Sequence, residues 1–180
     1  MTLTVKVSPG KHTIKLVKNG YFTVVKEVTV SAGETKDISI NLVETNRFTN
    51  AGIFIVPSTA KVGENVTIDI SVKNTSSYVT DRAKVQITYD GKTDEKMTDP
   101  ILPGNVKSVR FTIKFDSAGT KTIDIKFLAY VQDHENGSGW YVTDTATARV
   151  TVTEREATIN ISTTPSGAAV YIDGVYKGTT

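Results

Sequence analysis

The amino-acid sequence predicts an all-β protein. β-branched and aromatic residues alternate with polar residues along most of the chain, with the period of two that a half-buried strand requires. No window of about eleven residues or more carries the apolar stripe of an amphipathic helix. Clusters of Gly, Pro, Asn and Ser interrupt the alternating runs at short intervals, as turns between neighbouring strands do.

Composition and charge exclude several classes of protein. The chain is 38% hydrophobic and 22% charged, which is ordinary for a folded domain and unlike a disordered one. Its 21 basic and 19 acidic residues give a net charge of +2 and alternate along the strands, so no basic face for nucleic acid is expected. Cysteine is absent, which excludes disulfides, thiolate metal sites and a cysteine nucleophile.

No membrane span or secretion leader is expected in this sequence. No stretch approaches the roughly 18 uninterrupted apolar residues that a membrane-crossing helix needs. Met1 is followed by TLTVKV rather than by a basic and then apolar leader. If the parent protein is secreted, its signal peptide is therefore expected to have been removed.

The first 43 residues are expected to hold four short strands. Three turn signals, SPGKH, KNGY and SAGET, divide this region into alternating runs. The polar segment 43–50 lacks alternation and predicts a linker to the next domain. The inward positions of the four strands are Leu3, Val5 and Val7, then Ile14 and Leu16, then Val28 and Val30, then Ile38, Ile40 and Leu42.

Residues 44–156, linkers included, are expected to form a second domain. It contains about seven short strands in about 105 residues, each with one apolar face, which is typical of an immunoglobulin-like β-sandwich. The expected strands lie near 54–57, 65–74, 83–90, 92–98, 108–115, 121–133 and 141–153.

Residues 157–180 predict two more strands, the second of which is followed by a tight turn. Ile159 and Ile161 share a face in the first, and Val170 and Ile172 in the second. Asp173-Gly174 suits a two-residue type I′ hairpin, which wants positive φ at both central positions. Because two strands do not form a stable unit in water, this segment needs a partner.

Both terminal segments resemble one small module. The run TINISTTPSGAAVYIDGVYKGTT looks like the first half of a PEGA domain, a β module of prokaryotic surface proteins, with Pro165-Ser166-Gly167-Ala168 as its signature step. Ser166 departs from the glutamate of the family. The N-terminal run is similar to the second half of that module, in its Pro-Gly-Lys-His turn, its Lys-x-Gly-Tyr corner ending at Tyr21 and its Ala-Gly-Glu-Thr hairpin.

The middle of the chain resembles CARDB-like and archaeal surface-layer-like immunoglobulin modules. The resemblance lies in VGENVTIDISVKNTSS at 62–77, in LPGNVKSVRFTIKF and in SAGTKTIDI. It implies an immunoglobulin fold, and it does not fix a function, because one fold serves many functions.

The resemblance implies a PEGA-like module split between the two ends of the chain, with 1–43 as its second half and 157–180 as its first. Each half would expose unpaired strand edges, which proteins normally cover. The halves could close within one chain, or pair with the next copy in a head-to-tail string or a tandem array. The residues expected to carry this pairing are Leu3, Val5, Val7, Ile14, Leu16, Tyr21, Ile159, Ile161, Val170, Tyr171 and Ile172.

The sequence offers little for catalysis, and the chain is not expected to be an enzyme or to hold a cofactor. His12 and His134 are its only histidines, and no phosphate loop, nucleophile elbow or His-x-x-x-His pair occurs. The loop 132–141 is a candidate to hold a cation or to stack against a sugar ring, and the plain alternative is a solvated hairpin tip with Trp140 capping the core. The candidate loop residues are Asp133, His134, Glu135, Trp140 and Tyr141.

Four Asn-x-Ser/Thr sequons, at Asn65, Asn74, Asn136 and Asn160, are candidate glycosylation sites and favour an extracellular chain. The sequence therefore predicts a non-catalytic structural or adhesive module of a prokaryotic cell-surface protein, an archaeal surface layer being one setting. The alternatives are a module that binds cell-surface glycan and an accessory domain of a secreted hydrolase. Its expected partners are copies of itself.

Overall fold

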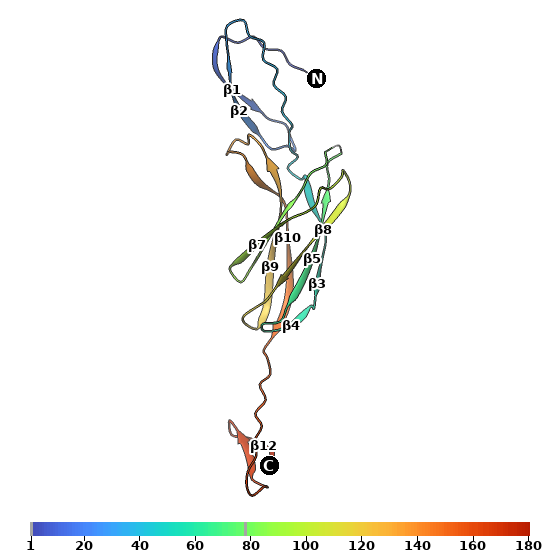
Figure 1. Ribbon diagram of the computed structural model, residues 1–180, viewed down its shortest axis with the longest axis vertical. Coiled ribbons are helices and arrows are strands. Elements are labelled where there is room, and N and C mark those ends of the chain that lie inside the picture. The colour runs from blue at the N-terminus through green and yellow to red at the C-terminus, as the bar shows by residue number, and fades with distance from the viewer. Residues whose placement is uncertain (1, 78) are drawn as a thin grey trace.

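The computed structural model describes residues 2–77 and 79–180 and confirms the all-β class. The described chain forms strands and no helix, so it contains no helical membrane span. A β-sandwich occupies the middle, with one two-stranded ribbon beyond each of its ends (Figure 1). The strands are β1 (Gly10–Leu16), β2 (Val24–Val30), β3 (Phe48–Val56), β4 (Thr59–Lys61), β5 (Val66–Asn74), β6 (Lys84–Tyr89), β7 (Lys92–Met97), β8 (Val106–Ile113), β9 (Gly119–Val131), β10 (Gly139–Thr153), β11 (Ala169–Ile172) and β12 (Val175–Thr179).

The sandwich packs a five-stranded sheet, in the order β4-β10-β9-β6-β7, against a three-stranded sheet, β3-β5-β8. Every pairing is antiparallel except that of β10 with β4. β4 has three residues, too few for alternation to reveal from sequence, and it covers the edge of β10. The opposite edge is β7, whose charged residues Lys92, Asp94 and Glu95 discourage pairing with another chain.

Alternation along the strands builds the core. In β5 the side chains of Val66, Ile68, Ile70 and Val72 are completely buried, while the residues between them reach the surface. They pack against inward residues of the facing sheet, including Phe127. Burying an aliphatic or aromatic side chain of this kind contributes about 1.5–3 kcal/mol. The apolar stability of the chain therefore resides in the sandwich.

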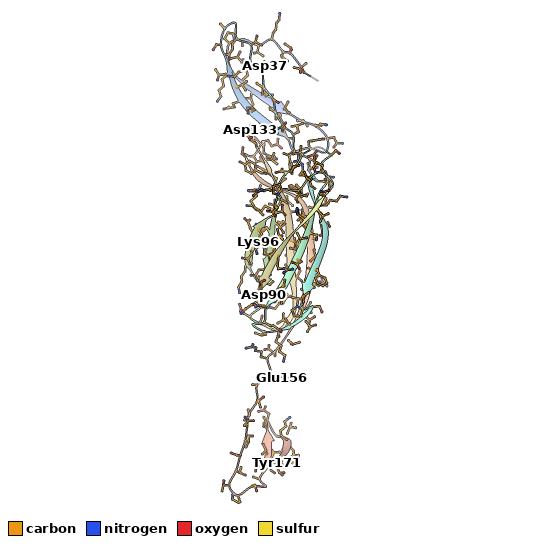
Figure 2. The ribbon with its side chains drawn as sticks, turned by 45° about the vertical axis from the view of Figure 1, so that its right-hand side comes forward. Asp37, Asp90, Lys96, Asp133, Glu156 and Tyr171 are labelled. Carbon is orange, nitrogen blue, oxygen red and sulfur yellow. The ribbon has the colours of Figure 1, made fainter. Side chains whose placement is uncertain are left out.

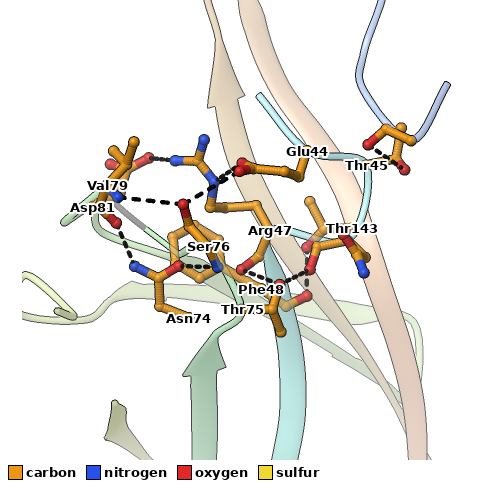
Figure 3. A network of polar contacts seen from close by, with 12 residues as sticks. Glu44, Thr45, Arg47, Phe48, Asn74, Thr75, Ser76, Val79, Asp81 and Thr143 are labelled. Atoms are coloured by element: carbon orange, nitrogen blue, oxygen red, sulfur yellow. Dashed lines mark hydrogen bonds and ion pairs between the residues drawn. The ribbon is translucent and has the colours of Figure 1, made fainter. Parts of the chain in front are cut away.

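The predicted linker 43–50 is anchored rather than free. Phe48 is fully buried in the core and Arg47 is only 2% exposed. The Arg47 guanidinium donates from Nε to Glu44 Oε2 at 2.5 Å and from Nη1 to Asp81 Oδ2 at 3.3 Å (Figure 3). Thr75 Oγ1 donates to the carbonyl oxygen of Arg47 at 3.2 Å. These contacts fix the chain where it enters the sandwich.

The expectation of four strands in the first 43 residues is wrong in this structure. Of the described residues there, only β1 and β2 form strands, and residues 2–7 and 34–43 are not paired as strands. Residues 157–163, also expected to be a strand, are unpaired too. Their alternating sequences suit strands, but a strand needs the backbone of a neighbouring strand to pair with it, and no described strand pairs with these segments.

Candidate functional site

The sandwich contacts the N-terminal ribbon, formed by β1 and β2, at the start of β2. Val24, 1% exposed, forms an isolated antiparallel bridge with His134. The Val25 amide donates to the carbonyl of Asp133 at 2.8 Å, and the Glu135 amide donates to the carbonyl of Thr23 at 3.3 Å. The loop between β9 and β10 thus serves as a short extra strand beside β2.

Side chains reinforce this junction. Lys26 Nζ lies 2.9 Å from Asp133 Oδ2, at the labelled loop residue in Figure 2, and Lys15 Nζ lies 3.2 Å from Glu135 Oε2. The ring of His134 stacks on Tyr141 with centroids 3.8 Å apart. Phe22 lies 5.7 Å from each of these two rings, edge-on to His134. The polar loop between β9 and β10 therefore binds the N-terminal ribbon.

The prediction that loop 132–141 holds a cation therefore finds no support in the geometry. Asp133 and Glu135 are ion-paired with lysines of the ribbon, and the aromatic contacts use His134 and Tyr141. Within the described residues, no three His, Asp or Glu side chains gather as a metal site would require. These loop residues instead contact the N-terminal ribbon of the same chain.

Trp140 and Tyr141 are separated, although the sequence pattern groups them. Neighbours along a strand point to opposite faces, so Tyr141 faces the junction while Trp140 lies on the outer surface of the five-stranded sheet. There Trp140 meets its cross-strand partner Tyr130 edge-on at 5.6 Å, with Lys84 Nζ 4.9 Å from the indole ring. Trp140 is therefore not a cap on the core. Tyr130 is missed from sequence because its neighbour depends on strand register.

The N-terminal half-module, residues 2–46, exposes much of its apolar surface. Leu3 is 87% exposed, and Val5 and Val7 also face solvent. Ile14 and Leu16 of β1 are half-buried on one face of the ribbon. Tyr21 bridges to Glu44, and Lys18 Nζ lies 4.1 Å above its ring. The Lys-x-Gly-Tyr corner thus ties the ribbon to the segment that enters the sandwich.

The C-terminal half-module, residues 156–180, is a ribbon preceded by an extended segment. Asp173 and Gly174 have φ of 50° and 78°, which confirms the predicted type I′ turn between β11 and β12. Val170 and Ile172 are half-buried on one face, and Tyr171, on the other, contacts Tyr176 at 5.5 Å. Ile159 is 67% exposed and Ile161 is also exposed. The apolar residues before β11 have nothing to pack against.

The two half-modules lie at opposite ends of the sandwich. Thr143 Oγ1 donates to the carbonyl of Phe48 at 2.7 Å, so β10 passes the start of β3 at Thr143. Val152 pairs with Ala60, so β10 ends where β3 has ended. Asp37 and Tyr171 mark the two far ends in Figure 2. In the described part of the chain, no strand of one half-module pairs with the other.

Three of the four sequons are accessible. Asn65, Asn136 and Asn160 are exposed. Asn74 is fully buried, and its Nδ2 donates to the carbonyls of Val79 at 2.7 Å and Ile101 at 2.8 Å (Figure 3). A glycan on this nitrogen is incompatible with the folded protein, so Asn74 is excluded from the candidate sites.

His12 lies within β1, opposite Val28 of β2, and its Nε2 is 2.7 Å from the carbonyl oxygen of Ser8. The contact is to backbone rather than to a partnered acid or nucleophile, which general acid–base catalysis would need. The sequence prediction of a turn at this histidine is wrong, because the turn ends earlier and His12 already pairs as part of β1.

Comparison with known proteins bears on both half-modules. Three solved structures are similar to the chain. The CARDB domain of a Pyrococcus furiosus protein, in complex with di-metal ions, is 20% identical with a TM-score of 0.46, and the match covers 61% of this chain and 94% of that one. The alkylpurine DNA glycosylase AlkC of Pseudomonas fluorescens, bound to DNA containing an abasic site analog, is 11% identical with a TM-score of 0.40, covering 59% and 30%.

A β-glucosidase of Erythrobacter marinus is 13% identical with a TM-score of 0.41, and the match covers 63% of this chain and 16% of that one. A search of curated proteins found no match. The model of the PEGA domain family matches residues 2–46 and 156–180, which confirms that the two segments flanking the sandwich are similar to PEGA domains.

Proposed function

We propose that this chain is a non-catalytic structural module of a cell-surface protein that joins copies head to tail through its two PEGA-like half-modules. One observation carries the proposal. The segments that match the PEGA family lie at opposite ends of the sandwich, and each leaves apolar strand sequences without a partner. A contact between different ends of successive copies does not close on itself, so it builds a string.

The reach of the chain favours pairing between copies over closure within one. From Thr143 to Thr153, β10 runs back along the sandwich for about 33 Å at ~3.3 Å per residue. Only residues 154 and 155 separate the end of β10 from the second PEGA match, and this stretch spans roughly 10 Å. Closure within one chain would therefore require residues 154–163 to run fully stretched along the whole sandwich, about 33 Å at ~3.3 Å per residue, before β11 reached the N-terminal ribbon.

Strand pairing would supply the energy of the contact. An isolated two-stranded ribbon is marginal in water, and each terminal half-module holds one such ribbon. Joining the halves would bury exposed apolar residues such as Leu3 and Ile159, at about 25 cal/mol for each Å² removed from water. Main-chain hydrogen bonds across the new edge would add to this. In a tandem array the same contact would join successive repeats.

The proposed location at the cell surface is supported by the similarity to PEGA domains and by the accessible sequons. PEGA domains are small non-enzymatic β modules, and the sequence likeness is to those of prokaryotic surface proteins. Asn65, Asn136 and Asn160 would be open to glycosylation there. Adhesion or a place in a surface layer fits a string of β-modules whose faces are free for other contacts.

Association as a function of concentration tests the proposal. The full chain is expected to sediment as growing oligomers as its concentration rises, whereas a double variant Ile159→Asp and Ile161→Asp stays monomeric. Phe54→Asp is the matched control, because Phe54 is an exposed apolar residue on the sandwich outside both half-modules. A wild-type chain that remains monomeric at the highest concentration would defeat the proposal.

Glycan binding remains a second candidate, carried by the aromatic pair on the outer sheet face. Tyr130 is 47% exposed beside Trp140, and Lys84 next to them is paired with Glu95 at 3.0 Å. Trp140 is the chain's only tryptophan, so its fluorescence would report binding directly. Soluble oligosaccharides are expected to change this fluorescence in the wild type and not in Tyr130→Ala. An unchanged wild-type spectrum would remove this candidate.

A further inference from the structure

The N-terminal ribbon has one open edge. On one side, β1 pairs with β2 in a seven-residue register from Gly10–Val30 to Leu16–Val24. The far edge of β2 lies beside its own chain, since residues 26–29 and 36–39 line the two walls of one groove and Lys36 Nζ donates to the carbonyl of Thr29 at 2.9 Å. No other described strand pairs with β1, whose far edge is therefore the one available for a new strand.

The C-terminal ribbon also has unequal edges. β12 contains Lys177 and Gly178, residues that typify the protected outer edge of a sheet. β11 has the sequence Ala-Val-Tyr-Ile, with no charge and no glycine. Its edge is the one suited to an interior position between two strands.

The faces of the two open strands match. On β1, Ile14 and Leu16 are half-buried and the residues between them are exposed. On β11, Val170 and Ile172 are half-buried and Tyr171 is exposed. If the strands lie side by side, these four aliphatic residues fall on one face. A slip of one residue would place the β11 aliphatics among Lys11 and Lys15, so a definite register is favoured.

We infer that the free edge of β1 receives β11 of a second copy, giving a four-stranded sheet in the order β12-β11-β1-β2. This rests on the proposed head-to-tail assembly and specifies which two strands meet in it. The lysines on the outer face of β1 do not oppose the approach, because Lys11 is paired with Glu27 at 2.7 Å and Lys15 with Glu135 at 3.2 Å.

Single-cysteine variants test which edge is used, because the natural chain has no cysteine. Thr13→Cys places a thiol on the outer face of β1, and Thr29→Cys places one on the outer face of β2 as the matched control. Each is mixed with a full-length Ala169→Cys or Tyr171→Cys variant under mild oxidation. Since disulfides need Cβ atoms about 4 Å apart, the Thr13→Cys mixture is expected to give about tenfold more mixed dimer.

The outcomes separate this inference from the proposed function, because association of the wild type is measured in parallel. Suppose that the wild type associates and that the Thr29→Cys variant gives at least as much mixed dimer as the Thr13→Cys variant. The inferred pairing through β1 is then wrong, while the proposed assembly still holds. The same holds if the wild type associates and neither variant crosslinks. If the wild type stays monomeric and neither variant crosslinks, both ideas fail.

Discussion

The imidazole of His134 stacks on the ring of Tyr141 with their centroids 3.8 Å apart, and this pair is the centre of the joint between the N-terminal ribbon and the sandwich. Phe22 closes the joint from the ribbon side. The ribbon is therefore held at a defined orientation, whereas the C-terminal ribbon follows an extended segment, seen between the sandwich and β12 in Figure 1. A string of such copies would have one stiff and one compliant connection per unit.

Truncating Phe22 should loosen the joint without unfolding the sandwich. Phe22→Ala removes a half-buried ring from two aromatic contacts, at a cost of about 1–2 kcal/mol because the site is only partly buried. The Val25 amide, which donates to Asp133, is expected to exchange its hydrogen faster, while core amides of β5 are unaffected. Phe54→Ala serves as the control. Unchanged exchange at Val25 would show that the ribbon is held by other contacts.

Removing the Arg47 side chain should destabilise the sandwich strongly. Arg47→Ala leaves Glu44 and Asp81 without their shared cation at a site where the arginine is 2% exposed, and breaking a buried pair typically costs about 3–5 kcal/mol. Arg110→Ala, which breaks an exposed pair with Asp69, is expected to cost far less, because water screens the pair. Urea unfolding of both variants gives the comparison, and equal losses would contradict it.

Asn74 and Asn65 should respond oppositely to mutation, although both begin a sequon. Asn74→Ala removes two hydrogen bonds to backbone carbonyls and one accepted from the Ser76 amide, and buried groups left unsatisfied cost about 1–3 kcal/mol each. Asn65→Ala, at an exposed position directly before β5, should stay within about 0.5 kcal/mol of wild type. Thermal unfolding measures both. A destabilised Asn65→Ala with an unaffected Asn74→Ala would reverse our assignment.

Stability at alkaline pH should depend on Tyr89. Burial, and next to it the hydrogen bond that its hydroxyl donates to Asp94 Oδ2 at 2.9 Å, raise the pKa of Tyr89 from 10.0 to about 12. Because the folded state binds this proton more tightly than the unfolded state, the contribution is complete below pH 10 and is lost as pH rises towards 12. Tyr89→Phe should lose less free energy of unfolding across that interval, and parallel curves would refute the assignment.

The sequence predicts the sandwich well because each of its longer strands shows the alternation of apolar and polar residues. Alternation at Val66, Ile68, Ile70 and Val72 marks an inward face that the structure buries completely. The Asp173-Gly174 turn is likewise predicted, because its chemistry is local. The same pattern at Leu3, Val5 and Val7 predicts a strand that does not form. Alternation shows that a segment has one apolar face, but it does not show whether another strand lies beside it.

The junction is harder to predict because it depends on contacts distant in sequence. Asp133, His134 and Tyr141 have the composition of a ligand loop, and only the fold brings Phe22 and Lys26 against them. Trp140 and Tyr141 are adjacent in sequence, yet they face opposite sides because of the pleat. The partner of Trp140, Tyr130, follows from the register of β9 against β10, which the sequence does not state.

The parallel course of β3 and β10 matters when the two termini are pulled apart. Tension would enter at Phe48 and leave at Thr153, along the strand axes rather than across them. The ladder hydrogen bonds lie perpendicular to that direction, so those of β3 with β5 and of β10 with β9 would be sheared together instead of being opened one after another. Such an arrangement resists stretching far better than a hairpin peeled from its end.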